Sequence, residues 1–591
     1  MTDKIRPLPG TSRRLTVEVK AGQVCIGKNN PVRIQTMVTS PTSDIAATVK
    51  ECMKVADAGA ELVRITAPTA KDAEALGMIR QELRRAEYNI PLIADIHFNP
   101  DVAEIAARNV EKIRINPGNF TDRQAMLQPD IADFEKNWND DLAKLRKRFV
   151  SLLKVCKEYG TALRIGSNHG SLSGRIMSKY GDTPAGMVES AMEFLRICKD
   201  EHFDSAVVSM KSSNTVVMVQ AYRLLVAAMD AEDMHYPLHL GVTEAGDGED
   251  GRIKSAVGIG SLLADGLGDT IRVSLTEAPE NEIPVARELV RHFFSRSAVS
   301  FSEKTALNSN DVSIGRTSLP GKKTVVVSDL SRWNPIRASD IESLGFGAKQ
   351  ESPVPDYVYT GSSAVMFDGE NPKIIDDSND NFIFCKYSEL GSSFTAWLRE
   401  NRDRTLVVSF DGAGSLAKQR SFFLELQRNE ITNPIIIARS YREKNFEKLQ
   451  IMAACDFGAL LIDGFGSGVM LSAEPCISPK LVSDLCFRIL QASRVRYTRT
   501  EYIACPGCGR TLFDLQETLK KVKKATSGLK NLKIGIMGCI VNGPGEMADA
   551  DYGYVGAGPG KITLYKGREA VKKNIPQQNA IEELIELIKK G

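Results

Sequence analysis

No histidine follows His292 in this chain, and only three cysteines lie in about the last hundred residues. All three belong to two short motifs, Cys505-Pro-Gly-Cys508 and Gly538-Cys539-Ile-Val-Asn-Gly-Pro-Gly-Glu546. The missing histidines exclude a Cys₂His₂ zinc site built from this region. Three thiols and one carboxylate suit a 4Fe–4S cluster, which needs four ligands and would here keep one iron for an oxygen ligand or for substrate.

Three other interpretations of these motifs remain open. A thioredoxin-like redox pair explains the helix predicted over 512–524 but leaves Cys539 without a role. A structural zinc ion held by three cysteines and Glu546 is compatible with the residues. Thiols packed in a core fit poorly, because Pro-Gly turns place both motifs on loops. The motifs favour a cluster over zinc, and zinc over a disulfide.

The chain also lacks a charge bias, a disulfide framework and a long apolar run. Lys and Arg number 76 against 74 Asp and Glu, which gives no bulk attraction to nucleic acid or to a membrane surface. The eleven cysteines are scattered, as in proteins of a reducing compartment. The first residues contain no apolar core of a signal peptide, and no stretch approaches the ~20 apolar residues of a membrane span. We therefore expect a soluble, cytoplasmic protein.

With 591 residues the chain is too long for a single core, and its first half shows a repeating pattern. After a predicted hairpin (15–19 and 23–26), short apolar runs alternate with helical stretches such as 45–58 and 101–108. Eight parallel strands with intervening helices predict a (β/α)₈ barrel. The strands are expected at 32–37, 62–66, 92–97, 112–116, 162–168, 205–211, 238–244 and 270–275.

Polar and charged residues recur where these strands end. In such barrels the carboxyl ends of the strands carry the active site. Five of the residues are cations, and two carboxylates can neutralise only two of them, so the surplus predicts a ligand with at least two negative charges. The strand-end residues are Arg64, Asp95, His97, Arg114, Asn116, Arg164, Asn168, His169, Ser209, Lys211, Thr243, Glu244 and Arg272.

A glycine-rich stretch, 258–268, precedes the eighth strand and is predicted to form the phosphate-binding corner that is common in these barrels. For any single residue a purely structural role is the simpler interpretation, because a lone Arg or His on a strand is most often paired inside the barrel. Because polar and charged residues recur at the ends of seven strands, a phosphate-bearing small substrate is favoured over purely structural roles.

The remaining chain predicts two further domains. Between 301 and 493, strands are expected at 324–328, 357–360, 382–385, 406–410, 434–439 and 459–463, with helices at 445–454 and 479–491, as in a barrel-like α/β domain without chemistry of its own. From 494 to 591, a compact α+β module carries the cysteine loops. The expected division is 1–300, 301–493 and 494–591.

The motifs Cys-Pro-x-Cys-Gly-Arg, Gly-Cys-x-Val-Asn-Gly-Pro-Gly-Glu and Ala-Asp-Ile-His-Phe closely resemble those of the 4-hydroxy-3-methylbut-2-enyl diphosphate synthases of the non-mevalonate isoprenoid pathway. The resemblance covers 10–300 and 490–591, and the middle segment is similar to that of the longer, three-domain form of the family. It implies reductive ring opening and dehydroxylation of 2-C-methyl-D-erythritol 2,4-cyclodiphosphate. It also implies an electron-donor protein, either ferredoxin or flavodoxin.

The resemblance further implies roles for individual residues. The cluster ligands would be Cys505, Cys508, Cys539 and Glu546. Glu244 would be the proton donor, with Asp95 and His97 orienting the substrate. The substrate-binding residues would be Arg64, Arg114, Arg164, Asn168, Ser209, Lys211 and Arg272.

Two rival functions remain at this point. One is a zinc-dependent aldolase or phosphatase on the same barrel, with a structural Cys₃ zinc module. The other is a zinc-ribbon-like interaction module attached to an inactive barrel. The sequence leaves open whether the chain forms a homodimer, which donor it uses, and whether the cysteine module closes on its own barrel or on a partner's.

Overall fold

The computed structural model describes residues 13–96, 99–120, 134–294, 324–333, 338–344, 346, 353–361, 373–376, 381–390, 392–410, 416–541 and 543–590. Their contacts divide the chain into two compact units. One unit contains 13–255, 267–291 and 499–590, and the other contains 256–266 and 292–498. The boundary expected at 300 lies outside the described residues.

The first unit contains the predicted barrel, with eight parallel strands in the order β8-β7-β6-β5-β4-β3-β10-β9. A parallel bridge between Val208 and Leu238 brings the two ends of this sheet together. The runs 62–66, 92–95, 112–115 and 162–168 are buried along their whole length, as expected for strands covered on both sides. The strands are β3 (Arg33–Met37), β4 (Leu62–Thr66), β5 (Leu92–Asp95), β6 (Lys112–Ile115), β7 (Ala162–Asn168), β8 (Ala206–Lys211), β9 (His239–Leu240) and β10 (Thr270–Ile271).

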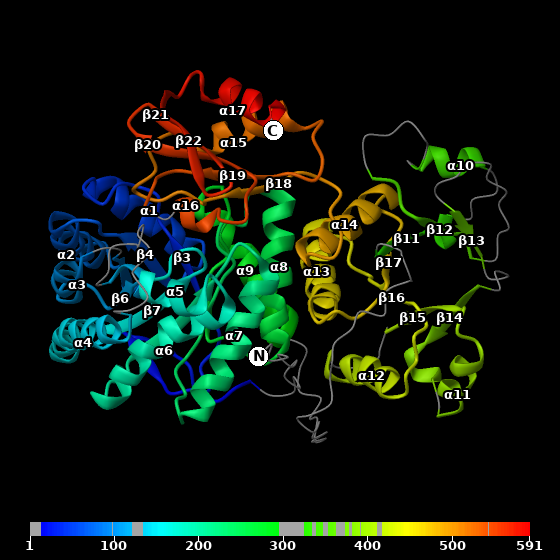
Figure 1. The fold of residues 1–591 in the computed structure, drawn as a ribbon, viewed down its shortest axis with the longest axis horizontal. Helices are drawn as coiled ribbons and strands as arrows, with labels where there is room; N and C mark the ends of the chain where they lie inside the picture. The colour runs from blue at the N-terminus through cyan, green and yellow to red at the C-terminus, as the bar shows by residue number, and fades with distance from the viewer. Residues whose placement is uncertain are drawn as a thin grey trace. The chain divides into compact units, whose positions relative to one another are not determined.

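Helices alternate with these strands and surround them (Figure 1). Several begin at a side-chain cap, such as Asp44, which accepts a hydrogen bond from the Ala47 amide at 3.0 Å, and Thr69, which forms a capping box with Asp72. The barrel helices are α1 (Ile45–Asp57), α2 (Ala70–Arg85), α3 (Pro100–Ala107), α4 (Phe134–Tyr159), α5 (Gly174–Tyr180), α6 (Pro184–Asp200), α7 (Thr215–Ala231), α8 (Gly248–Ala264) and α9 (Glu282–Phe294).

A short hairpin covers the amino-terminal end of the barrel. Its strands, β1 (Val19–Ala21) and β2 (Val24–Ile26), contribute Val19, Ala21 and Ile26 to a buried cluster with Leu62 and Ala162, which lie at the starts of barrel strands. Because the hairpin covers this end, only the opposite end, where the strands finish, is available for a ligand and for the C-terminal module.

The C-terminal module is a five-stranded sheet in the order β18-β19-β20-β21-β22, parallel over the first three strands and antiparallel over the last three. Helices α15 (Leu515–Thr526) and α17 (Ala580–Lys589) pack together over this sheet (Figure 1). The strands are β18 (Glu501–Ala504), β19 (Lys533–Met537), β20 (Tyr552–Gly558), β21 (Lys561–Lys566) and β22 (Glu569–Pro576). A one-turn helix, α16 (Gly543–Glu546), follows β19.

The second unit is a seven-stranded parallel sheet with the order β13-β12-β11-β17-β16-β15-β14. Within the described residues its two edge strands, β13 and β14, do not pair with each other, so the unit is barrel-like rather than a closed barrel. Its strands are β11 (Val325–Asp329), β12 (Tyr357–Tyr359), β13 (Lys373–Ile375), β14 (Phe382–Lys386), β15 (Thr405–Ser409), β16 (Ile435–Ser440) and β17 (Gly468–Ser472). Its helices are α10 (Ala338–Ser343), α11 (Ser392–Glu400), α12 (Leu416–Arg428), α13 (Phe446–Ile462) and α14 (Pro479–Ala492).

Two sequence predictions near this unit were wrong. The strand expected at 459–463 is the end of helix α13, and the true strand, β17, follows it. The glycine-rich stretch 258–268 is helical as far as Ala264, and Gly260 serves packing: a Cβ on it would lie 2.7 Å from the Cys455 sulfur. Gly260 therefore permits close contact with α13 and does not form a phosphate-binding corner.

The expected fold class is confirmed: a (β/α)₈ barrel, a barrel-like α/β segment and an α+β module that carries the cysteines. Within the described residues, no helix combines the length and the apolar character needed to cross a membrane.

Candidate active site

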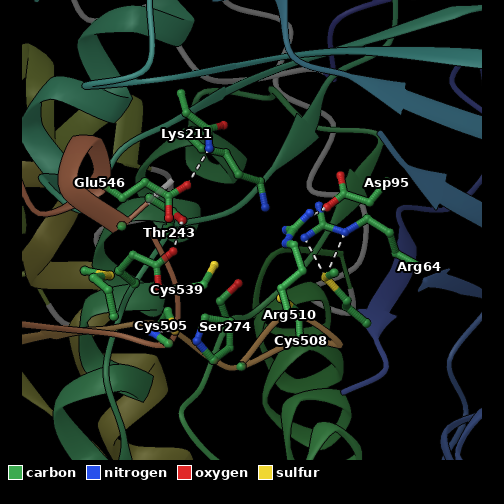
Figure 2. A pocket seen from close by; sticks show the side chains of 18 of the residues that line it. Arg64, Asp95, Lys211, Thr243, Ser274, Cys505, Cys508, Arg510, Cys539 and Glu546 are labelled. Carbon is green, nitrogen blue, oxygen red and sulfur yellow. Dashed lines mark hydrogen bonds and ion pairs between the residues drawn. The ribbon is translucent and has the colours of Figure 1, made fainter. Parts of the chain in front are cut away.

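One cavity lies where the ends of the barrel strands meet the cysteine loops of the C-terminal module (Figure 2). Both parts belong to the same compact unit, so the site is formed within one chain. The barrel contributes Met37, Arg64, Asp95, Arg114, Asn168, Lys211, Thr243, Glu244, Arg272 and Ser274. The module contributes Cys505, Pro506, Gly507, Cys508, Arg510, Met537, Gly538, Cys539, Gly543 and Glu546.

Most of the residues singled out from the sequence meet in this cavity: Arg64, Asp95, Arg114, Asn168, Lys211, Glu244, Arg272, Cys505, Cys508, Cys539 and Glu546. Arg164 and Ser209 are buried but do not line it. Arg164 precedes Asn168 by four residues on β7, and Ser209 precedes Lys211 by two on β8, so both lie deeper in the barrel. His97 lies outside the described residues.

The cations of the cavity are only partly neutralised by the barrel. Arg272 forms an ion pair with Glu282 at 3.0 Å, and Arg114 forms one with Asp95 at 3.3 Å. No recorded ion pair among the described residues joins Arg64 to a carboxylate, and its guanidinium instead contacts the Met37 sulfur at 2.8 and 3.0 Å.

Burial without a full set of counter-charges disfavours the charged forms of these groups. It lowers the pKa of Arg64 to about 10, and it lowers the pKa of Lys211 and of Arg164 well below their ordinary values, with neighbouring cations adding to the effect. Nε and Nη1 of Arg164 are buried without a hydrogen-bond partner in the described structure. An anion held in the cavity would offset this cost for the cations that line it.

On the barrel side of the cavity, Glu244 has an unusual backbone conformation. Its φ of 51° places a buried, non-glycine residue in the left-handed region, which costs energy and is maintained only by its surroundings. Thr243 Oγ1 donates to its carboxylate at 3.0 Å, and the next residue, Ala245, forms a parallel bridge with Ala504 of the module. Burial raises the pKa of Glu244 well above its ordinary value, and the nearby Glu546 carboxyl raises it further.

Parallel strands bring the cysteine loops together. β18 and β19 are neighbours, so the loops that follow them begin at the same edge of the sheet and place Cys505 beside Gly538, whose amide donates to the Cys505 sulfur at 3.3 Å. Gly507 has a φ of 84°, which lets the chain turn between the two cysteines of the first motif.

Glu546, at the end of α16, links the module to the barrel. Asn168 Nδ2 donates a hydrogen bond to Glu546 Oε1 at 2.6 Å, and the Ser213 hydroxyl donates to its carbonyl at 3.4 Å. The carboxylate therefore lies between the thiols of the module and the polar strand ends of the barrel.

The cysteine motifs bring three thiols and one carboxylate around the cavity. Cys505, Cys508, Cys539 and Glu546 surround one cavity, and none of the other cysteines, all of which are described, lines it. Among the described residues, no group of three or more His, Cys, Asp or Glu side chains is arranged to hold a metal ion. A 4Fe–4S cluster needs four ligands, and this set has that number and includes three thiols.

Arg510 was not assigned a role from the sequence, although it completes the motif Cys-Pro-Gly-Cys-Gly-Arg. It lies in the cavity beside Cys508 and Arg64, and its Nη2 is 3.7 Å from Asp95 Oδ2 (Figure 2). Its Nε and Nη1 are buried without a hydrogen-bond partner in the described structure. Met37, Ser274 and Glu282, the partner of Arg272, were also missed, and no sequence signal distinguished them.

Further contacts fix the module on the barrel of its own chain. Arg568 pairs with Asp182 at 2.7 Å, and Lys254 pairs with Glu501 at 2.8 Å. The backbones approach most closely at Gly170, where an added Cβ would lie 1.9 Å from the carbonyl oxygen of Gly545. Closure over the chain's own barrel, which the sequence left open, is the arrangement in this structure.

A barrel with a surplus of buried cations at its mouth, facing three thiols and a carboxylate, defines an enzyme that holds an anion beside a redox-competent centre. Known proteins agree with this class. Residues 16–287 match the GcpE TIM-barrel domain, and residues 501–590 match the GcpE protein C-terminal domain.

Full-length relatives carry one name, 4-hydroxy-3-methylbut-2-en-1-yl diphosphate synthase (flavodoxin). The relative from Phocaeicola vulgatus is 48% identical and covers 98% of this chain and 98% of its own length. Those from Porphyromonas gingivalis and Leptospira interrogans are 46% and 42% identical, over 98% of this chain and 98% and 97% of their own. The chain belongs to this family of diphosphate synthases, which are oxidoreductases of isoprenoid precursor biosynthesis, as the motifs indicated.

Among solved structures, a dihydropteroate synthase from Stenotrophomonas maltophilia covers 48% of this chain and 99% of its own, at 13% identity and a TM-score of 0.33. A likeness this low carries no argument.

The close backbone approach at Gly170 gives a first prediction. Gly170→Ala should reduce turnover by at least about tenfold, because its Cβ would push the module away from the barrel mouth. The matched control is Gly160→Ala, which has a similar φ (67° against 77°) but no atom within 4 Å of the new Cβ. Both changes carry the ~1–2 kcal/mol strain of a left-handed alanine. Equal turnover in the two variants would show that this contact is not needed.

Proposed function

We propose that this enzyme converts 2-C-methyl-D-erythritol 2,4-cyclodiphosphate to 4-hydroxy-3-methylbut-2-en-1-yl diphosphate and receives its electrons from flavodoxin. The observation that carries the proposal is a single cavity that joins buried cations without enough counter-charge to three thiols and a carboxylate. The relatives' names supply the product and the donor, and favour flavodoxin over ferredoxin.

Written for the fully protonated substrate and product, the reaction consumes two electrons and two protons. A ring carbon–oxygen bond breaks and its oxygen stays with the diphosphate, which becomes linear. A hydroxyl group leaves as water, and a carbon–carbon double bond forms. The chain therefore has to hold two phosphates, supply a proton near the leaving hydroxyl, and keep water away from the reacting carbons.

The barrel cations hold the diphosphate. Arg64 and Lys211 are the best placed, because they line the cavity and their burial is not offset by a recorded ion pair within the described chain. Arg114 and Arg272 add charge while paired to Asp95 and Glu282. Guanidinium groups match phosphate oxygens in pairs, which fixes orientation as well as affinity.

Arg164 and Ser209 lie deeper in the barrel than the cations that line the cavity. Arg164 is fully enclosed and has two guanidinium N–H groups without partners in the described structure, so its charge favours an anion above it. Ser209 Oγ would lie 3.2 Å from a Cβ on Gly166, which places it in the same layer as the Arg114 side chain. Asn168 links the two halves of the site through Glu546.

Cys505, Cys508, Cys539 and Glu546 would hold a 4Fe–4S cluster. When bound, the cluster supplies single electrons and an iron whose oxygen ligand can be exchanged. Glu546 is suited to be the exchangeable ligand because Asn168 can hold its carboxylate on the barrel side at 2.6 Å. All three cysteines line the cavity at the mouth of the barrel, so electrons arrive next to the bound anion.

Glu244 delivers the proton to the leaving hydroxyl. Its strained backbone aims the carboxyl group into the cavity, and the bridge between Ala245 and Ala504 holds it under the first cysteine loop. Asp95 orients the substrate through Arg114, to which it is paired. His97 is proposed, from the sequence motif, to assist in this orientation.

Metal analysis tests the cluster directly. Protein purified without oxygen should be brown and contain about four irons and about four sulfides per chain. Glu546→Ala should lose iron faster, because it removes one ligand. Asp549→Ala, which breaks another contact across the same interface, to Asn214 at 3.4 Å, should retain it. A colourless protein that contains zinc would refute the cluster and restore the zinc alternative.

Binding of inorganic pyrophosphate to the anaerobic holoenzyme tests the cation site. Arg164→Ala should weaken this binding by about tenfold or more, the ~1.4 kcal/mol expected for losing a buried positive charge near the anion. Arg175→Ala is the control, since Arg175 is also buried and charged but pairs with Glu193 away from the cavity. Calorimetry that gives equal affinities for the two variants would exclude Arg164 from anion binding.

Arg510 adds a cation from the opposite side of the anion. We expect Arg510→Gln to weaken pyrophosphate binding by about three- to tenfold while the iron content stays unchanged. Arg568→Gln, which removes the exposed pair with Asp182, should leave the affinity unchanged. A loss of iron without a loss of affinity in Arg510→Gln would instead place Arg510 with the thiols.

A further inference from the structure

A surface groove runs along the outside of the first cysteine loop. Its walls are the loop before α1 with the start of that helix, the turn 277–280, and the segment 506–516 that leads into α15. Its volume is about 940 Å³, and all of its residues belong to the unit that contains the active site. No step of the proposed reaction uses this groove.

The groove and the active-site cavity share a wall. Pro506, Gly507 and Cys508 line both spaces, so one short stretch of chain separates the substrate side from the outer surface. Cys508 is half-buried rather than enclosed. The cavity side of this stretch faces the barrel mouth, and the groove side opens to the outer surface.

Most charges along the groove already have partners. Glu51 accepts hydrogen bonds from the amides and hydroxyls of Thr39 and Ser40, and Lys54 pairs with Glu280 at 2.5 Å. These contacts hold the walls in place. The exposed side chains that are available to contact a docked protein include Lys50 on α1 and Gln516 on α15.

From this shared wall we infer that the groove is the docking site of the flavodoxin and that Pro506–Cys508 is the point at which electrons enter. The inference rests on the proposed function. A small inorganic reductant can diffuse to the thiols, whereas a protein donor has to dock at a surface that brings its flavin close to them. In each docking event the reduced flavin loses one electron and the enzyme gains it. Two docking events supply the two electrons needed for one substrate molecule.

Blocking the groove should separate the two kinds of reductant. Lys50→Trp and Gln516→Trp add bulk to the groove from two different segments, and neither residue lines the active site. Both variants should raise the KM for reduced flavodoxin by about tenfold or more. They should leave kcat with dithionite and a viologen dye unchanged. Calorimetry with oxidised flavodoxin and the anaerobic holoenzyme should show the same loss of affinity.

Matched controls place the same side chain on the same helices outside the groove. Ala46→Trp on α1 and Lys521→Trp on α15 are exposed substitutions that do not line it, and they should behave as the unmodified enzyme. Equal effects of groove and control variants, or no effect of either, would place the docking site elsewhere. Slower turnover with dithionite as well would show damage to the site and overturn the inference. If the unmodified enzyme turns over with neither reductant, the proposed function itself fails.

Discussion

The active site depends on a balance of charge between the barrel mouth and the C-terminal module. The barrel mouth buries more positive charge than its own carboxylates neutralise, as the lowered pKa values of Arg64 and Lys211 indicate. The module opposite it presents thiols and Glu546, groups that bind a metal cluster as anions. Each half supplies what the other lacks, and an anionic substrate completes the balance.

Strand polarity explains how residues from distant parts of the sequence meet. All eight barrel strands are parallel, so their last residues face one side, and β18 and β19 are parallel as well. The bridge from Ala245 to Ala504 joins the ends of the two sheets and brings Glu244 within reach of Glu546. The geometry of the site is thus a consequence of sheet topology more than of any single loop.

Much of this was predictable from the sequence, and the failures have physical causes. The barrel strands were found because each is a short apolar run that ends in a polar residue. The run 459–463 has the same composition but belongs to α13, because a buried helix and a buried strand look alike over five residues. Glycines at 258–268 suggested a phosphate loop, whereas Gly260 serves contact with Cys455. The role of Arg510 depends on how the module sits on the barrel, which no local pattern records.

The first cysteine loop is subject to two opposing demands. It must seal the reaction from water, since a charged, reducing site open to solvent would lose both electrostatic strength and electrons. Because the proposed electron donor is another protein, the loop must also lie near the surface. The stretch Pro506–Cys508 meets both demands, because it lines the cavity on one side and the groove on the other. A bulky or helical segment would separate the two spaces too widely to meet both. The Pro-Gly turn between Cys505 and Cys508, with Gly507 at a φ of 84°, keeps this wall to a short stretch of chain and places both cysteines at the cavity.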